Sequence, residues 1–233
     1  MYISAKYKII FIRTPKTGSS SLIDFLIQNL DDPDAIHSGS PDGMIKVLPT
    51  VEFPGERIAG PLHHKIHHMT LAELIDLKMI PIEALRWNIF TVIRDPIERQ
   101  KSFYYFFKQF WSRRQPASLE EYHRFTRDGW IFERNDHGLD SITGLLQSDM
   151  VRWNETPLGD YWLYEDMNER AHQLLKDLGV ELKFQMPRHK ARPELLKGGS
   201  LEFDGKTLAQ LHKELAPDFK LYEKLKRKRD EAN

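Results

Sequence analysis

Apolar runs along this chain alternate with stretches of helical periodicity, which predicts strands followed by helices. An apolar run at residues 8–12 precedes a helical pattern over residues 19–30. The run NIFTVI, residues 88–93, is continuous, as in a strand that is buried on both faces of a parallel sheet. The run DYWLYEDM predicts a strand that ends near Tyr164 and leads into a helix that stops at Gly179. Together these units predict an α/β fold in which helices cover both faces of a central parallel sheet.

Capping residues predict where several helices begin. Thr70 and Glu73 have the spacing of a capping box, so a helix should start just after Thr70. Asp95 can cap the helix that follows the strand at 88–93, and Pro96 suits its first position. Near the C-terminus, LAQLHKELAPDFKLYEKL predicts two helices broken at Pro217.

The length of 233 residues suits a single domain spanning residues 1–233. Residues 112–154 are polar and rich in aromatic side chains, and they are too many for a simple connection. We interpret them as a mainly helical insertion that shapes a substrate cleft. The segment ERIAG, residues 56–60, predicts a further short strand.

Composition excludes several classes of function. The chain has no cysteine, which excludes disulfides, cysteine-ligated zinc, iron–sulfur clusters and a thiol nucleophile. The 34 acidic residues balance the 34 basic ones, so no overall field favours nucleic acid and an anion site has to be local. No apolar run approaches the roughly 20 residues of a membrane span, and no signal-peptide pattern is visible. These features predict a cytoplasmic protein.

A turn between the first strand and its helix is suited to anions. The first amides of a helix have no partner within the helix, and the helix dipole favours negative charge there. In a standard nucleotide-triphosphate loop, GxxxxGK followed by serine or threonine, the lysine follows the last glycine, whereas here it precedes the glycine by two residues. A standard kinase is therefore disfavoured, while an ordinary serine-capped turn remains an alternative. The candidate anion-binding residues are Lys16, Thr17, Gly18, Ser19, Ser20 and Ser21.

A second candidate anion site follows the strand at 88–93. Arg94 stands at the carboxyl end of this strand, where open α/β sheets bind ligands. Ser102 follows eight residues later, on the predicted helix. Each residue alone is compatible with an ordinary role, an ion pair for Arg94 and a plain helical position for Ser102.

Together, the two motifs resemble those of sulfotransferases that use 3′-phosphoadenosine 5′-phosphosulfate (PAPS), above all the glycan-type branch. FIRTPKTGSSSL is similar to the loop for the 5′-phosphosulfate, and FTVIRDPIERQKSFYYFF to the strand and helix for the 3′-phosphate. LYEDM and APDFKLYEKL resemble later segments of the family. The resemblance implies a P-loop-like three-layer fold around a parallel sheet. The matching positions of the second motif are Arg94, Asp95, Pro96, Arg99 and Ser102.

The resemblance also implies roles for individual residues. Lys16 would stabilise charge on the bridging oxygen as the sulfuryl group leaves, in an in-line transfer that needs no metal. Arg94 and Ser102 would hold the 3′-phosphate. The basic segment MPRHKARPE is either a solvated loop or a flap over the cofactor, in which Arg188 and Lys190 would contact PAPS.

A histidine cluster offers a general base for the acceptor. GPLHHKIHHMTLAEL contains His63, His64, His67 and His68, and the i, i+4 spacing also suits zinc. The capping box at Thr70 instead places the cluster before the helix, in a loop, and a purely structural role is a further alternative. Sulfotransferases that this chain resembles have a histidine just before such a helix, which His68 matches, with His67 as the second candidate. A histidine titrates near neutral pH, as such a base requires.

We therefore predict a PAPS-dependent sulfotransferase that releases 3′-phosphoadenosine 5′-phosphate (PAP). Its expected acceptor is a hydroxyl, less readily an amine, of a carbohydrate-type molecule. The alternatives are an ATP-dependent kinase, which would require Mg²⁺ and ignore a 3′-phosphate, and a non-catalytic nucleotide- or glycan-binding module. The exact acceptor and the oligomeric state are not evident from the sequence.

Overall fold

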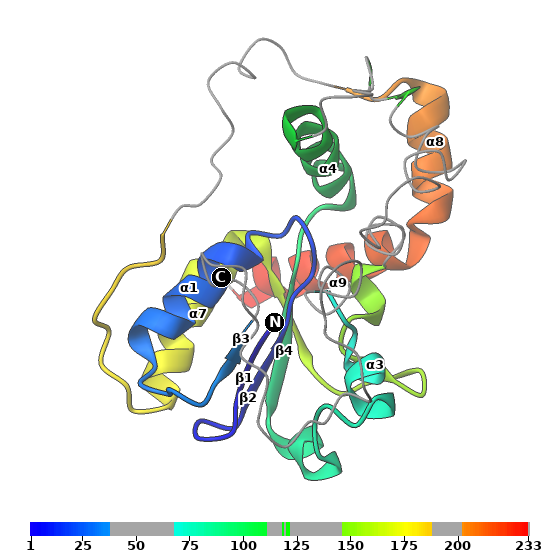
Figure 1. Ribbon diagram of the computed structural model, residues 1–233. Helices are drawn as coiled ribbons and strands as arrows, with labels where there is room; N and C mark the ends of the chain where they lie inside the picture. Colours follow the sequence, from blue (N-terminus) through cyan, green and yellow to red (C-terminus); the bar gives the residue numbers. More distant parts are fainter. Residues whose placement is uncertain (38–67, 111–117, 119, 122–145, 188–201, 233) are drawn as a thin grey trace.

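A five-stranded sheet forms the centre of the computed structural model, which describes residues 1–37, 68–110, 118, 120–121, 146–187 and 202–232 (Figure 1). The strand order is β3-β1-β2-β4-β7. Strands β2, β4 and β7 run parallel, whereas β1 pairs antiparallel with both β2 and β3. The predicted α/β class and central parallel sheet are confirmed, with two short antiparallel strands added at one edge. The strands are β1 Tyr2–Ser4, β2 Ile9–Ile12, β3 Ile36–His37, β4 Asn88–Ile93 and β7 Asp160–Leu163.

Helices cover both faces of this sheet because its strands are apolar on both sides. On one face, Ile9 and Phe11 pack with helices α1 and α7, which lie together in Figure 1. On the other face, Ile10 and Ile12 pack with α3 and the segment that follows it. The result is the predicted three-layer arrangement. The three helices are α1 Ser19–Asn29, α3 Leu71–Asp76 and α7 Met167–Asp177.

Three further helices pack beyond the carboxyl end of β4. Helix α4, Pro96–Phe110, packs through an aromatic cluster against α8, Gly205–Glu214. Helix α9, Ala216–Ala232, places Tyr222 against Ile93 and Leu163 of the sheet. Helix α9 therefore contacts the strand that leads into α4 and the neighbouring strand β7.

The predicted helix starts and ends are largely confirmed. Thr70 and Glu73 form the capping box at the start of α3. The Glu98 N–H donates to Asp95 Oδ1 at 2.9 Å in the first turn of α4. Gly179, at φ 68°, follows the end of α7. The break between α8 and α9 falls two residues before Pro217, since a proline fits the first turn of a helix.

Short elements complete the described part of the chain. They are the 3-10 helices η1 Ile82–Arg86, η2 Gln147–Asp149 and η3 Tyr164–Asp166, and the antiparallel pair β5 Arg152–Trp153 and β6 Thr156–Pro157. The predicted strand at 56–60 and most of the predicted insertion at 112–154 lie outside the described residues. The described end of the insertion, from residue 146, contains η2 and β5. Of the helices described, none has the length and apolar character needed to cross a membrane.

Candidate active site

The turn that joins β2 to α1 has an unusual backbone. Lys16 has φ 66° and Gly18 has φ 74°, both in the left-handed region. For lysine this conformation costs roughly 1–2 kcal/mol, so the turn has to be held by its surroundings. A Cβ on Gly18 would lie only 2.8 Å from Cε2 of the Tyr164 ring. The glycine is therefore required both by its conformation and by the close approach of Tyr164.

Hydroxyl groups within the turn hold its backbone. Thr17 Oγ1 donates to the Thr14 carbonyl oxygen at 2.9 Å, and Ser19 Oγ donates to the same oxygen at 3.1 Å. Thr14 Oγ1 lies 2.7 Å from Oγ1 of Thr91 on β4. Thr17 and Ser19 are buried, and their hydroxyl protons are used inside the turn. An anion would therefore meet the backbone N–H groups of these two residues rather than their hydroxyls.

Arg13, at the start of the turn, is a cation that the sequence reasoning missed. Its guanidinium donates to Ser19 Oγ at 3.3 Å and to Ser20 Oγ at 2.8 Å. Burial lowers the pKa of Arg13 to about 10, partly offset by Asp24, so the group is still charged at neutral pH. It adds positive charge beside the amino end of α1, where the helix dipole already favours an anion.

The predicted base, His68, lies next to the turn. Its Nδ1 is 3.1 Å from the carbonyl oxygen of Arg13. A carbonyl oxygen can only accept, so Nδ1 carries the proton and the neutral ring has its lone pair on Nε2. The other predicted histidine, His67, lies outside the described residues, as do His63 and His64.

Arg94 and Tyr164 lie at the carboxyl ends of neighbouring strands, β4 and β7. The Arg94 guanidinium lies 4.9 Å from the centre of the Tyr164 ring and 3.6 Å from a carboxylate oxygen of Glu98. Tyr164 therefore contacts both Gly18 and Arg94, and so joins the two predicted anion sites. The segment LYEDM contains Tyr164, but its sequence pattern predicts no contact of this ring with the turn or with Arg94.

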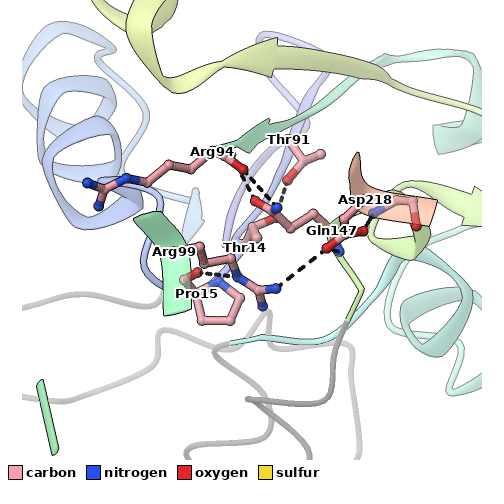
Figure 2. A network of polar contacts seen from close by, with 8 residues as sticks. Thr14, Pro15, Thr91, Arg94, Arg99, Gln147 and Asp218 are labelled. Atoms are coloured by element: carbon pink, nitrogen blue, oxygen red, sulfur yellow. Dashed lines mark hydrogen bonds and ion pairs between the residues drawn. The ribbon is translucent and has the colours of Figure 1, made fainter. Parts of the chain in front are cut away.

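The side chain of Lys16 and the backbone of Arg94 have further partners. Lys16 Nζ lies 4.3 Å from the centre of the Phe106 ring on α4, and Ser102 is half-buried on the same helix. Figure 2 shows the backbone of Arg94 paired with the side-chain amide of Gln147. Arg188 and Lys190, of the predicted flap, lie outside the described residues. Within the described ranges, no three histidine or acidic side chains are grouped to hold a metal ion.

A family model described as "Sulfotransferase family" matches residues 1–225 of the chain. The chain belongs to the sulfotransferase family. A solved structure of a sulfotransferase from Alicyclobacillus acidocaldarius is 16% identical, with a TM-score of 0.41, and the match covers 92% of this chain and 93% of that one. Comparison with curated proteins gives no match. The family membership confirms the predicted resemblance and the prediction of an enzyme that transfers a sulfuryl group.

In this sulfotransferase, two cations belong to the turn between β2 and α1, and a third follows β4. Arg13 lies at the start of the turn, Lys16 lies within it, and Arg94 reaches it through Tyr164. Converging positive charge and helix-start amides favour a ligand with several negative charges. The predicted residues Lys16, Gly18, Arg94 and His68 thus border one region, whereas Ser102 lies two helical turns along α4.

Proposed function

We propose that this sulfotransferase takes its sulfuryl group from PAPS and transfers it to a hydroxyl of a carbohydrate-type acceptor. The observation that carries the proposal is the contact of Tyr164 with both Gly18 and Arg94. It links an anion-binding turn to a second cation, as a nucleotide with charged groups on its 5′ and 3′ oxygens requires. PAPS supplies a sulfuryl group on a phosphate that is a good leaving group.

The turn supports the 5′ end of the donor. The amides at the start of α1 lie beside the Arg13 guanidinium, which donates to Ser20 Oγ, and Lys16 belongs to the turn that leads into this helix. The proposed role of Lys16, which lies within this turn, is to stabilise negative charge on the phosphate oxygen that the sulfuryl group leaves. Such placement of fixed charge, together with alignment, accounts for most of the catalysis in transfers of this kind. Thr17, Ser19, Ser20 and Ser21 contribute through the backbone and through the shape of the turn.

The second site supports the 3′ end. Arg94 is the proposed ligand of the 3′-phosphate, which distinguishes PAPS from ATP and other common adenine nucleotides, and Ser102, further along α4, remains the second candidate ligand. The ring of Tyr164 keeps the Arg94 guanidinium near the turn. Arg188 and Lys190 remain candidates for closing over the same phosphate.

His68 is the proposed general base. Its Nδ1–H donates to the Arg13 carbonyl, which fixes the tautomer with the lone pair on Nε2. The oxygen of the acceptor hydroxyl attacks the sulfur, and Nε2 accepts the proton of that hydroxyl. The bond between the sulfur and the phosphate oxygen breaks, and PAP is released. His67 remains the second candidate for this role. The carbohydrate character of the acceptor follows from the likeness of both motifs to glycan-type enzymes.

The experiment is calorimetric titration of PAP and AMP into the wild type and into Arg94→Ala. We expect the wild type to bind PAP at least about tenfold more tightly than AMP, since a charge-assisted contact contributes that much or more. Arg94→Ala should lose most of this difference while its AMP affinity stays within about twofold of the wild type. Equal affinities for PAP and AMP in the wild type would overturn the proposal.

The acceptor class is tested separately, by measuring PAP release from PAPS in the presence of saccharides and of matched acceptors. Monosaccharides and disaccharides should raise the release above the rate in water, and phenols or steroids should not. Faster release with phenols than with sugars would contradict the carbohydrate assignment and leave the PAPS assignment in place.

A further inference from the structure

A buried carboxylate, Asp218, is connected to both segments that are proposed to bind the nucleotide. Asp218 lies in the first turn of α9 and is 1% exposed. Its Oδ2 and Oδ1 accept the backbone N–H groups of Gln147 and Ser148, each at 2.9 Å. Its Oδ2 also lies 3.7 Å from Nη1 of Arg99 (Figure 2). One buried charge thus has partners on α4 and on η2.

The first connection runs through Arg99 to the turn. Arg99 is fully buried, and its Nε donates to the Pro15 carbonyl oxygen at 3.2 Å. Pro15 directly precedes Lys16, whose left-handed backbone needs external support. Arg99 therefore fixes the peptide group next to the proposed catalytic lysine.

The second connection runs through Gln147 to Arg94. The Arg94 N–H donates to Gln147 Oε1 at 2.8 Å, and Gln147 Nε2 donates to the Arg94 carbonyl oxygen at 2.9 Å. Gln147 is 1% exposed, and its own N–H is held by Asp218. Through Gln147, the Asp218 carboxylate therefore holds the backbone of Arg94, and through Arg99 the same carboxylate supports the turn.

We infer that Asp218, Arg99 and Gln147 form a positioning unit that sets the separation of the 5′ and 3′ anion sites. Burying a charge pair costs desolvation, and well-packed apolar side chains are often as stable, so stability alone is a weak reason for this unit. Two rigid connections from one carboxylate instead hold the turn and Arg94 at a fixed spacing. The inference rests on the proposed function, because it concerns the spacing of those two sites.

The two connections make separable predictions for three probes: PAP, AMP, which has only the 5′-phosphate, and adenosine 3′-monophosphate. Arg99→Lys keeps the charge but loses the Nε–H that binds Pro15. This variant should bind PAP and AMP about tenfold more weakly, and its affinity for the 3′-monophosphate should stay within about twofold of the wild type. Gln147→Leu removes both hydrogen bonds to Arg94. This variant should lose affinity for PAP and for the 3′-monophosphate by a similar factor, and its affinity for AMP should not change.

Asp218→Asn tests the shared anchor. An amide keeps the shape of the carboxylate, but its NH₂ faces one of the two N–H donors. Affinity for all three probes should fall, and most for PAP, because both connections loosen together. If this variant does not fold, Arg99→Lys and Gln147→Leu still decide the inference.

The matched control is Asn29→Ala. Asn29 is also a buried polar side chain that joins two segments, since its Oδ1 accepts the N–H groups of Lys183 and Phe184. It lies at the far end of α1 from the turn, so its loss should lower the melting temperature without changing the ratios among the three affinities.

The outcomes are distinguishable. Selective losses in the two variants support the positioning role. Two results would overturn the positioning role even if the wild type prefers PAP to AMP. One is unchanged affinities in both variants, and the other is an equal loss of affinity for all three probes that follows the drop in melting temperature. A wild type without that preference overturns the proposed function itself.

Discussion

Single residues join the parts of this site, and Gly18 is the position that tolerates the fewest other amino acids. Its φ is 74°, and a Cβ at this position would lie only 2.8 Å from Cε2 of the Tyr164 ring, so there is no room for a side chain. Gly179 has a similar φ of 68°, but a Cβ at this position would have no atom within 4 Å. The two glycines therefore separate the cost of backbone strain from the cost of a steric clash.

We predict that Gly18→Ala lowers the free energy of unfolding by more than the roughly 1–2 kcal/mol expected of the left-handed conformation alone. It should also weaken PAP binding, because Tyr164 is displaced from Arg94. Gly179→Ala should show the backbone cost only and keep wild-type affinity. Urea unfolding and calorimetry check both variants, and equal effects of the two would mean that the Tyr164 contact is unimportant.

A second residue-scale prediction concerns His68→Gln. Glutamine can still donate an N–H to the Arg13 carbonyl but provides no basic lone pair. The rate of sulfuryl transfer should fall about 100-fold or more, and PAP affinity should stay within about twofold. His212→Gln, at an exposed position on α8, is the control and should keep full activity. Unchanged turnover in His68→Gln would place the base elsewhere.

At the scale of elements, local patterns predicted most of the sheet and its helices. The continuous apolar run of β4, the capping box of α3 and the glycine after α7 are signals within a few residues of one another, and each is confirmed. Strands β1 and β3 were missed because they have three and two residues and form only by pairing across the chain. Short strands of this kind carry little periodicity.

Helix α8 provides a prediction for pH dependence. Asp204 caps this helix, and its pKa is lowered chiefly by the hydrogen bond from the Thr207 backbone N–H. A lowered carboxyl pKa contributes stability above the ordinary carboxyl pKa, and this stability is lost as the pH falls through the folded-state value. Asp204→Asn keeps a capping oxygen that does not titrate.

We therefore expect wild type and Asp204→Asn to differ most in unfolding free energy at neutral pH and to converge as the pH falls below about 4. Urea unfolding at a series of pH values measures the difference. Glu202→Gln, at an exposed position just before the same helix, is the control for the loss of a surface carboxylate. A difference that grows on acidification would contradict the sign of the Asp204 pKa shift.

At the scale of the whole molecule, the site consists of groups that are distant in sequence. Arg99 contacts Pro15 across 84 positions, and Gln147 contacts Asp218 across 71. The sequence motifs contained Arg99 and Asp218, but their partners could not be predicted, because a buried contact depends on the packing of α4 and α9 on the sheet. Family likeness predicted the anion-binding segments, and the fold shows the buried contacts that join them.

The same connections predict how the whole chain responds to its ligand. The apolar clusters on the two faces share the central sheet, and Asp218 ties α9 to α4 and η2. The chain should therefore unfold as one domain, in a single transition.

PAP at about 100 times its dissociation constant should raise the unfolding free energy by about 2.7 kcal/mol, because it binds only the folded state. Arg94→Ala, which should bind PAP about tenfold more weakly, should show a rise of only about 1.4 kcal/mol at the same PAP concentration. Calorimetric scans with and without PAP measure this, and two transitions of which only one responds to PAP would contradict the single domain.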